Sequence, residues 1–333
     1  MRSEVQRLPA EFLERLRKII PPQKWDEIAN TFTEPRPTTF RVNTLKREEG
    51  RGSVQERLEH QGFRLERWGQ SLESGTVPVY RAFILRSGRL RDLQETDIYK
   101  KGEVYVQSLS SMLPPLVLNP QPGERILDLT AAPGSKTTQL ACLMKGEGEI
   151  VANDNNQIRF FKLKANVESQ GAKNVRVSMK SGELFGRDYP ENFDRVLVDA
   201  PCSAEGRFLV TEPASYKYWK PAKVKEMARK QKNLVLSGFR ALKPGGTLVY
   251  STCTFAPEEN EEVLDWLMEK IRDGPGGHLS PIPELSLRTV PNQTAGFTQW
   301  NGKSLAPSIN NARRILPTPL MEAFFIAKVL KAK

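Results

Sequence analysis

Strands and helices alternate along the second half of this chain, and this pattern limits the possible fold more than any other feature of the sequence. Apolar runs of strand length are separated by longer runs with helical spacing, and several of the latter end at glycine. The expected strands are residues 125–129, 149–153, 174–178, 193–199 and 246–252, and the expected helices lie near 137–145, 156–170, 221–242 and 257–271. Such alternation is typical of α/β proteins with a doubly wound parallel sheet.

We therefore expect residues 119–333 to form one α/β domain around a doubly wound, mostly parallel sheet of seven strands. Two later extended runs, one around Leu287 and one from Glu322 to Leu330, would complete the sheet as an antiparallel pair at its edge. A linker with Pro120, Pro122 and Gly123 precedes the first strand of this domain.

The first 118 residues show two other patterns. In residues 1–35, apolar side chains recur at helical spacing from 3 to 20, a shorter helix follows, and we interpret these N-terminal helices as packing material. Residues 36–118 predict a small α+β domain with strands at 39–44, 63–68, 79–85 and 104–107, a helix opened by the capping box Ser53-x-x-Glu56, and a short helix at 108–118. In outline this domain is similar to small RNA-binding domains.

The segment Arg125–Lys136, RILDLTAAPGSK, predicts a buried strand, a tight turn and the start of a helix. The turn has almost no side chains, so a ligand can approach its backbone at the helix N-terminus. The turn lacks the glycine patterns of dinucleotide-binding and phosphate-binding loops. The next strand ends at Asp154, 20 residues after Gly134, where a carboxylate can accept both hydrogens of a ribose diol. S-adenosylmethionine, which has a ribose and a sulfonium but no phosphate, fits these residues better than NAD or ATP.

The charge of the chain favours a polyanionic partner. Its net charge is +11, which suggests a polyanionic partner such as nucleic acid. The densest basic segment has seven basic residues against the single acid Glu226, and they are Lys217, Lys220, Lys223, Lys225, Arg229, Lys230 and Lys232. Tyr216, Tyr218 and Trp219 are interleaved with them, so the segment predicts phosphate contacts with stacking surfaces, and a solvated face is the alternative.

Other classes of partner are not expected. No run approaches the ~20 apolar residues of a membrane span, and early acidic residues argue against a transit peptide, so we expect a cytoplasmic monomer without a membrane partner. Three widely spaced cysteines and two histidines provide neither a disulfide framework nor zinc-ligand spacing, so no metal site is expected.

Two of the cysteines follow neighbouring strands of the expected sheet. Cys202 lies in the sequence DAPCS after one strand, and Cys253 lies in STCTF after the next. Because ligands of an open parallel sheet bind at the carboxyl ends of its strands, both thiols should face the same cleft as Asp154. A thiolate is a good carbon nucleophile, although a cysteine can also be a small buried apolar residue.

The motifs DLTAAPGSKT, DAPCS and STCTF, in this order and spacing, resemble the Sun-type family of RNA cytosine-C5 methyltransferases, which includes the bacterial RsmB-like rRNA enzymes. The resemblance extends over roughly residues 105–330. It implies the Rossmann-like fold of class I methyltransferases, S-adenosylmethionine as the methyl donor, and RNA as the substrate, with ribosomal RNA ahead of transfer RNA.

The resemblance also implies roles for particular residues. Cys253 would attack C6 of cytosine, Cys202 would help to remove the C5 proton and release the enzyme, and Asp199 would act on N3 as general acid. Lys136 would line the active site. The implied cofactor contacts are Thr130, Ala131, Ala132, Pro133, Gly134, Ser135, Lys136, Asp154, Arg159, Ser181 and Asp199. Ser181 stands where the family usually has an adenine-binding aspartate, and Glu183 is the alternative contact.

Two rival functions stay open at this point. A DNA cytosine-C5 methyltransferase would use Cys202 as its nucleophile and would leave Cys253 without a role. A non-catalytic RNA-binding or ribosome-assembly protein could have kept the fold, and the missing carboxylate at Ser181 is the feature that favours it.

Overall fold

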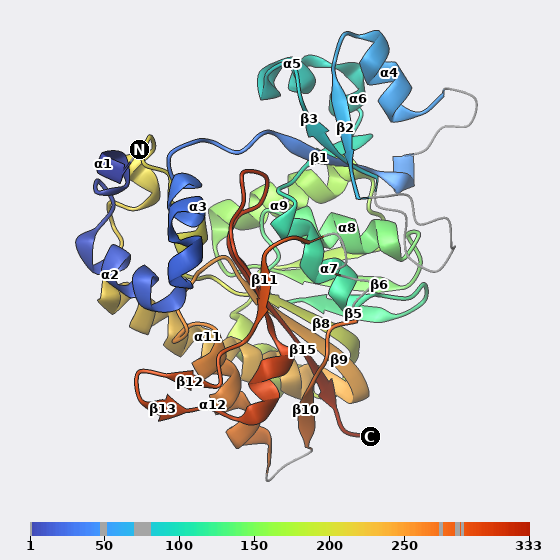
Figure 1. Cartoon of the computed structure of the whole chain (residues 1–333). Helices are drawn as coiled ribbons and strands as arrows, with labels where there is room; N and C mark the ends of the chain where they lie inside the picture. The colour runs from blue at the N-terminus through green and yellow to red at the C-terminus, as the bar shows by residue number, and fades with distance from the viewer. Residues whose placement is uncertain (1, 47–51, 70–80, 273–275, 284–286, 288–289) are drawn as a thin grey trace.

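A long twisted sheet forms the centre of the molecule. The computed structural model of the chain describes residues 2–333 except 47–51, 70–80, 273–275, 284–286 and 288–289. The order of strands in the sheet is β11-β14-β15-β9-β8-β5-β6-β7, and β10 pairs with β15 outside this path (Figure 1). A separate four-stranded sheet, in the order β2-β3-β1-β4, is built from the first third of the chain.

The central strands of the large sheet run parallel, as predicted. They are β5 (Arg125–Asp128), β6 (Glu149–Asn153), β7 (Val175–Ser178), β8 (Phe193–Asp199) and β9 (Leu242–Thr252). The start of β9 lies four residues before the expected one, because Leu242 already pairs with Phe193 ahead of a register irregularity. The doubly wound fold is therefore confirmed.

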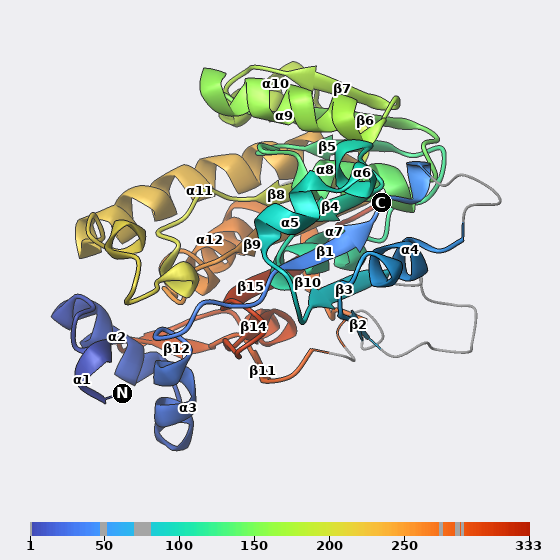
Figure 2. The same cartoon turned by 90° about the horizontal axis from the view of Figure 1, so that it is seen from above.

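Helices cover both faces of the large sheet. They are α7 (Leu113–Leu118), α8 (Ser135–Leu143), α9 (Gln157–Gln170), α10 (Phe185–Asp188), α11 (Pro221–Ala241) and α12 (Glu261–Arg272). Ile126 and Leu197 point into a core shared with α7, α8 and α9, whereas Leu127 and Val196 point into a core shared with α11 and α12. Figure 2 shows α7 and α8 on one side of the sheet and α11 and α12 on the other. Both strand faces are thus buried, which explains the continuous apolar runs.

The last part of the chain adds antiparallel strands. They are β10 (Gly277–Ser280), β11 (Gln293–Ala295), β14 (Arg313–Ile315) and β15 (Phe324–Lys331), and β12 (Gln299–Trp300) and β13 (Lys303–Ser304) form a separate hairpin. The predicted strand 322–330 is confirmed as β15, which pairs with β9. The predicted strand around Leu287 falls largely outside the described residues, and β14 occupies the place beside β15. Within the described residues, β10 and β11 extend the expected seven strands to nine.

The small α+β unit is also confirmed. Its antiparallel strands are β1 (Thr39–Val42), β2 (Leu65–Trp68), β3 (Ala82–Leu85) and β4 (Val104–Val106), and its helices are α4 (Val54–His60), α5 (Leu90–Glu95) and α6 (Asp97–Lys100). The predicted capping box is present, since Ser53 Oγ accepts a hydrogen bond of 3.1 Å from the backbone N–H of Glu56. Residues 79 and 80 of the third predicted strand lie outside the described residues.

One buried arginine joins this small sheet to the cofactor turn. Arg41 of β1 donates from Nη2 to Thr138 Oγ1 at 2.6 Å and to the Ser135 carbonyl at 3.1 Å, both in the first turn of α8. The same guanidinium donates from Nε to Gln107 Oε1 at 2.8 Å. The small sheet is therefore held beside the N-terminus of α8.

The N-terminal segment packs against the large domain. It forms α1 (Arg2–Val5), α2 (Ala10–Ile19) and α3 (Trp25–Asn30) instead of one helix over 3–20, because Pro9 separates the first two. The ring of Phe12 lies 4.8 Å from that of Phe208 and 5.7 Å from that of Trp219, so its interpretation as packing material is confirmed. The division of the chain into three domains at residues 35 and 118 stays a prediction. In the described part of the chain, no helix is both long enough and apolar enough to cross a bilayer.

Candidate active site

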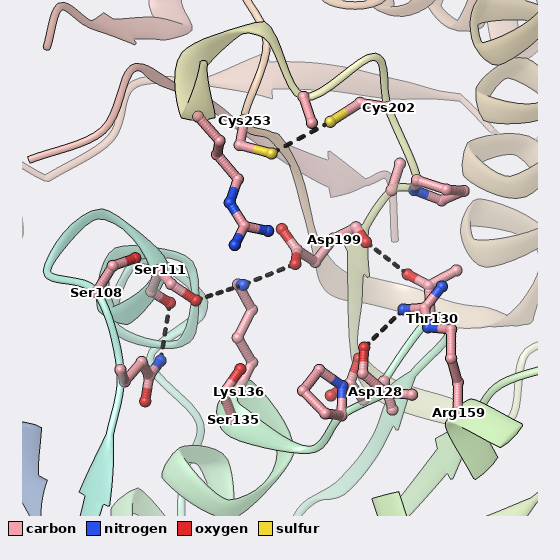
Figure 3. A pocket seen from close by; sticks show the side chains of 18 of the residues that line it. Ser108, Ser111, Asp128, Thr130, Ser135, Lys136, Arg159, Asp199, Cys202 and Cys253 are labelled. Atoms are coloured by element: carbon pink, nitrogen blue, oxygen red, sulfur yellow. Dashed lines mark hydrogen bonds and ion pairs between the residues drawn. The ribbon is translucent and has the colours of Figure 1, made fainter. Parts of the chain in front are cut away.

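A cavity of about 670 Å³ opens at the carboxyl ends of the parallel strands. Its walls come from the ends of β5, β8 and β9, from β4 of the small sheet and from the residues before β15 (Figure 3). Its volume lies within the roughly 300–1,000 Å³ of small-molecule sites. Lining residues include Tyr105, Ser108, Ser111, Asp128, Thr130, Ala131, Ala132, Pro133, Ser135, Lys136, Arg159, Lys162, Asp199, Cys202, Arg207, Cys253, Glu322 and Phe324.

The turn between β5 and α8 forms one wall of the cavity. Thr130 Oγ1 donates to the Asp199 carbonyl at 2.9 Å, which ties this turn to the end of β8. Gly134 lies behind the wall with a φ of 106°, and a Cβ there would come within 3.1 Å of the Leu163 side chain. The turn thus depends on glycine to bring the N-terminus of α8 close to α9.

A lysine–aspartate pair crosses the floor of the cavity. Lys136 Nζ lies 2.6 Å from Asp199 Oδ2 and donates to Ser111 Oγ at 2.7 Å. The other carboxylate oxygen of Asp199 accepts from Ser251 Oγ at 2.7 Å. Lys136 is only 7% exposed, so its charge is balanced by Asp199 inside the protein. Both predicted catalytic residues therefore have a fixed orientation.

The two strand-end cysteines meet at the same cavity. Cys202 Sγ and Cys253 Sγ are 3.4 Å apart, although the residues are 51 positions apart in the chain, and both thiols are free. The hydrogen bond with Cys253, together with burial, raises the pKa of the Cys202 thiol well above its usual range. In the free protein Cys202 is therefore held as the thiol.

Asp128, at the end of β5, is a buried acid with one free oxygen. Its Oδ2 accepts from Thr137 Oγ1 at 2.7 Å, while its buried Oδ1 has no hydrogen-bond partner. Burial raises the pKa of this carboxyl to about 7. An oxygen of this kind on a cavity wall suits a cationic group of a ligand.

Three of the expected cofactor residues differ in whether they line the cavity. Arg159 lines the cavity and donates to the Ala132 carbonyl at 2.6 Å. Asp154 is buried behind it, 3.3 Å from the Arg159 guanidinium, and is not among the lining residues. Ser181, which precedes a short 3₁₀ turn at 182–184, also lies outside the lining, and Glu183 is exposed to solvent.

The basic segment lies around the start of α11 and not in the cavity. Lys217, Lys220, Lys223, Arg229 and Lys230 are all exposed. Tyr218 is 77% exposed, but Trp219 is buried, with Nε1 donating to Glu205 Oε1 at 3.0 Å. The interpretation of Trp219 as a stacking surface is therefore wrong, because its ring belongs to the core beneath α2.

Comparison with known proteins decides the family. A family model described as 16S rRNA methyltransferase RsmB/F matches residues 115–330. The chain belongs to the RsmB/F family. Its fold is accordingly that of the class I methyltransferases, and the resemblance seen in the three motifs is confirmed. Among the described residues, no group of three His, Cys, Asp or Glu side chains could hold a metal ion.

Individual relatives and solved structures support this family assignment. The chain is 36% identical over its whole length to the tRNA (cytosine(49)-C(5))-methyltransferase of Pyrococcus abyssi, 99% of which is covered. It is 40% identical over 97% of its length to ribosomal RNA small subunit methyltransferase F of Vibrio parahaemolyticus, but spans only 63% of that relative. A crystal structure of a methyltransferase homologue from Pyrococcus horikoshii matches 97% of the chain, with a TM-score of 0.74, 32% identity and full coverage of that protein.

Several cavity residues of this RsmB/F member were not expected from the sequence. Ser111 bonds to Lys136, Tyr105 and Lys162 add to the lining from β4 and α9, and Arg207 lies 3.7 Å from Glu322. Their only sequence signal was indirect, since Tyr105 and Ser111 lie in a segment, YVQSLSSM, that takes part in the family resemblance. The other positions come from distant parts of the chain, so no local pattern reveals them.

Proposed function

We propose that this chain methylates C5 of a cytidine in RNA through a covalent adduct, with Cys253 as the nucleophile and Cys202 as the residue that releases it. Membership of the family makes the chain an S-adenosylmethionine-dependent RNA cytosine-C5 methyltransferase. The observation that supports the covalent route is the 3.4 Å contact between the two sulfurs, beside the Lys136–Asp199 pair. A cytoplasmic monomer is part of the same proposal.

Two thiols are needed because C5 of cytosine is a poor nucleophile. Addition of the Cys253 thiolate forms a bond to C6 and moves the electron pair of the 5,6 double bond onto C5. Asp199, fixed by Lys136 and Ser251, would supply the hydrogen bond or proton at N3 that accommodates this charge. After C5 has gained the methyl group, a base must remove the C5 proton. The 5,6 double bond then re-forms and the Cys253 sulfur leaves with its electron pair.

Cys202 becomes a base at the right stage of this sequence. In the free protein its pKa is raised mainly by the hydrogen bond with Cys253, and the charge of Cys253 adds to the effect. Both contributions disappear once the Cys253 sulfur is bonded to C6. Burial still raises the pKa of Cys202 at this stage, but loss of the two contributions from Cys253 lowers it, so Cys202 can release its proton to solvent and then accept the proton from C5.

The residues of the cavity fit S-adenosylmethionine. When bound, this cofactor supplies an electrophilic methyl group on its sulfonium. We infer that the turn Thr130–Lys136 holds it against the backbone, that the unpartnered Asp128 Oδ1 accepts its ammonium group, and that Asp154 binds the ribose when Arg159 is displaced from it. Ser181 would lie near the adenine, as the resemblance implies.

The affinity for the cofactor should depend on pH through Asp128. Its pKa is raised to about 7 in the folded protein by burial, so the carboxylate that pairs with an ammonium forms as pH rises through 7. We expect the affinity for S-adenosylhomocysteine to increase about tenfold from pH 6 to pH 8, by linkage of proton release to binding. Titration calorimetry should show a much flatter profile for Asp128→Asn. Equal pH profiles for the two proteins would contradict this role, since the charged groups that act on Asp128, which are Asp199, Lys136 and Asp154, are common to both.

The same shift predicts the sign of a stability change. The pKa of Asp128 is about 7 when folded, against about 3.9 for aspartate in an unfolded chain. Between these values the folded state binds a proton that the unfolded chain has released, so the contribution of Asp128 to stability is lost as pH rises through 7. The unfolding free energy of Asp128→Asn minus that of the wild type should therefore be larger at pH 8 than at pH 5, which means that the variant is relatively more stable at the higher pH.

Transfer RNA is the substrate class that we propose first. The tRNA-modifying relative is matched along 99% of its length, whereas the rRNA-modifying relative is matched along 63%. Purified protein should be incubated with S-adenosylmethionine and either unmodified tRNA or small-subunit rRNA, followed by bisulfite sequencing. A cytidine in tRNA that becomes resistant to bisulfite conversion supports the proposal. A resistant cytidine in rRNA alone would make rRNA the substrate instead, and no resistant cytidine in either RNA would contradict the proposal.

The basic segment is expected to bind RNA phosphates. Lys223 and Lys230 share the exposed acid Glu226, at 3.2 and 2.7 Å, and Arg229 lies between them on the exposed face of α11. Replacing Lys223, Arg229 and Lys230 with alanine should weaken binding to all RNAs alike and reduce the salt dependence of affinity by roughly one unit of slope for each phosphate that is no longer neutralised. Glu226→Gln is the control, and it should keep the full slope. If the triple variant keeps the wild-type slope, these three residues do not contact RNA phosphates and only form a solvent-exposed face.

A further inference from the structure

Two buried glutamates connect the loops that carry the cysteines, and the proposed reaction gives neither of them a role. The Cys202 loop, residues 200–208, follows β8, and the Cys253 loop, residues 252–260, joins β9 to α12. Glu205 belongs to the first loop and Glu259 to the second, and they are 1% and 0% exposed. Each sends its carboxylate to the other loop.

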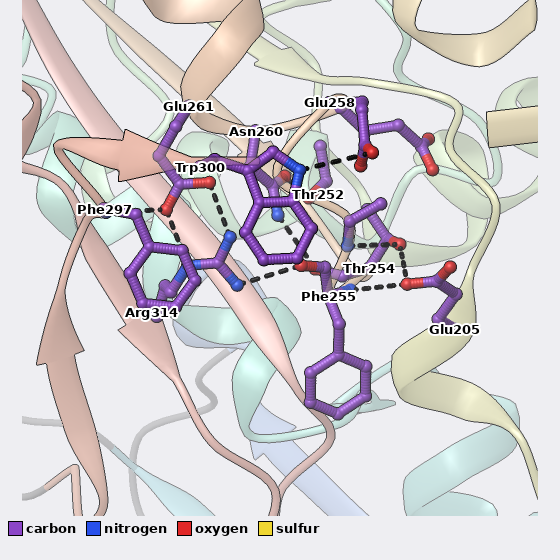
Figure 4. A network of polar contacts seen from close by, with 12 residues as sticks. Glu205, Thr252, Thr254, Phe255, Glu258, Asn260, Glu261, Phe297, Trp300 and Arg314 are labelled. Atoms are coloured by element: carbon purple, nitrogen blue, oxygen red, sulfur yellow. Dashed lines mark hydrogen bonds and ion pairs between the residues drawn. The ribbon is translucent and has the colours of Figure 1, made fainter. Parts of the chain in front are cut away.

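Glu205 reaches from the Cys202 loop to the residues that follow Cys253. Its Oε2 accepts from Thr254 Oγ1 at 2.8 Å and from the Phe255 backbone N–H at 3.1 Å (Figure 4). Its Oε1 accepts from the buried Trp219 Nε1 at 3.0 Å, which anchors the glutamate to the core under α2. The position of the Cys253 backbone is therefore set by a side chain of the opposite loop.

Glu259 makes the reciprocal connection. Its Oε2 accepts from the backbone N–H of Ser203, next to Cys202, at 2.9 Å, and from Gln231 Nε2 at 2.9 Å. Gln231 of α11 also donates to the Pro201 carbonyl at 2.9 Å, so both neighbours of Cys202 are held by this pair. The Cys202 backbone thus depends on a side chain of the Cys253 loop.

Further bonds close the space between the two loops. Ser203 Oγ lies 2.8 Å from Thr254 Oγ1, and the Gly206 N–H donates to the Cys253 carbonyl at 2.9 Å. A Cβ at Gly206 would lie 2.5 Å from the Ala323 carbonyl, so the chain can pass here only as glycine. Burial raises the pKa of Glu259 to about 7 and also raises that of Glu205. Apolar side chains would be less costly to bury, so a fold that needed only packing here would not require these acids.

We propose that Glu205 and Glu259 are positioning residues for the two catalytic sulfurs, and that Glu259 fixes Cys202 while Glu205 fixes Cys253. This proposal rests on the division of labour described under Proposed function. It predicts that loss of the two glutamates has opposite consequences, because one supports the releasing thiol and the other supports the nucleophile. A role in stability alone would affect both steps in the same direction.

The test compares covalent RNA adducts on denaturing gels. The full chain reacts in single turnover with S-adenosylmethionine and the unmodified form of the RNA that it methylates. Glu259→Ala should accumulate adduct like Cys202→Ala, with release slowed about 100-fold, the loss expected for a 1 Å misplacement. Glu205→Ala should instead form adduct about 100-fold more slowly. Glu259→Gln should restore release, since its amide oxygen can accept from Ser203 and its NH₂ can occupy the position of Oε1, which has no partner in the wild type.

Two neighbouring acids provide matched controls. Glu258 belongs to the Cys253 loop, but its partners Arg15 and Trp300 lie outside both cysteine loops, so Glu258→Gln should behave as the wild type. Glu261→Gln weakens the ion pair with Arg314 instead, and should lower the melting temperature without accumulating adduct. Adduct levels in Glu259→Ala and Glu205→Ala that change together, or no rescue by Glu259→Gln, would overturn the positioning roles. Failure of Cys202→Ala itself to accumulate adduct would instead refute the proposed mechanism.

Discussion

Replacing Cys253 with alanine is expected to reduce methyl transfer to RNA below detection and to prevent any covalent complex. Without a sulfur at this position, nothing adds to C6 and C5 never becomes nucleophilic. Transfer of a radiolabelled methyl group from S-adenosylmethionine to RNA measures the effect.

The third cysteine provides the control for this experiment. Cys142 lies on α8, where its Sγ is 3.2 Å from Asn43 Oδ1, and it does not line the cavity. Cys142→Ala should therefore keep the rate of the wild type. Methyl transfer by Cys253→Ala at a rate comparable with Cys142→Ala would exclude Cys253 as the nucleophile.

The largest effect on stability is expected from the buried ion pair between Glu261 and Arg314. The two side chains are 0% and 4% exposed, and two hydrogen bonds of 2.5 and 2.6 Å join them (Figure 4). Glu261→Ala would leave the Arg314 guanidinium charged and unpaired inside the protein, which costs about 3–5 kcal/mol of unfolding free energy. Urea unfolding measures this loss. A loss below about 1 kcal/mol, the range of exposed pairs, would contradict the account.

A double substitution separates the pair from the space that it fills. Glu261→Leu combined with Arg314→Met removes both charges and keeps the volume, so it should be much more stable than Glu261→Ala. The pair also bears on the active site, since Arg314 Nη1 donates to the Phe255 carbonyl at 2.9 Å, two residues after Cys253. The double variant should therefore fold but lose part of its activity.

The sequence predicted the large sheet well because both faces of its strands are buried. Ile126 and Leu127 point to opposite cores, so their strand is apolar throughout and stands out in the sequence. The glycines that end the expected helices also agree with the structure, since Gly171 adopts a φ of 66° after α9. Local signals of this kind place elements but not their partners.

The missed features depend on contacts between distant residues. β14 is three residues long and contains two arginines, and Arg314 can be buried in it only because Glu261 neutralises its charge from α12. Trp219 was predicted as a stacking surface because it lies among basic residues, but it is buried through a hydrogen bond to Glu205, 14 residues away. The motifs predicted that Cys202, Cys253, Asp199 and Lys136 belong to one site, and all four line the same cavity. No motif indicates the hydrogen bonds of Glu205 and Glu259, which lie behind the cysteines.

Denaturing gel electrophoresis of Cys202→Ala and Cys253→Ala with labelled RNA and S-adenosylmethionine tests the central claim most directly. The 3.4 Å contact places both sulfurs at the same point of the cavity, so the two variants differ only in which thiol remains. If Cys253 attacks and Cys202 releases, Cys202→Ala should methylate, stall and retain RNA in a denaturant-resistant band, whereas Cys253→Ala should give none. A band that persists in Cys253→Ala and is absent from Cys202→Ala would reverse the two roles and contradict the mechanism.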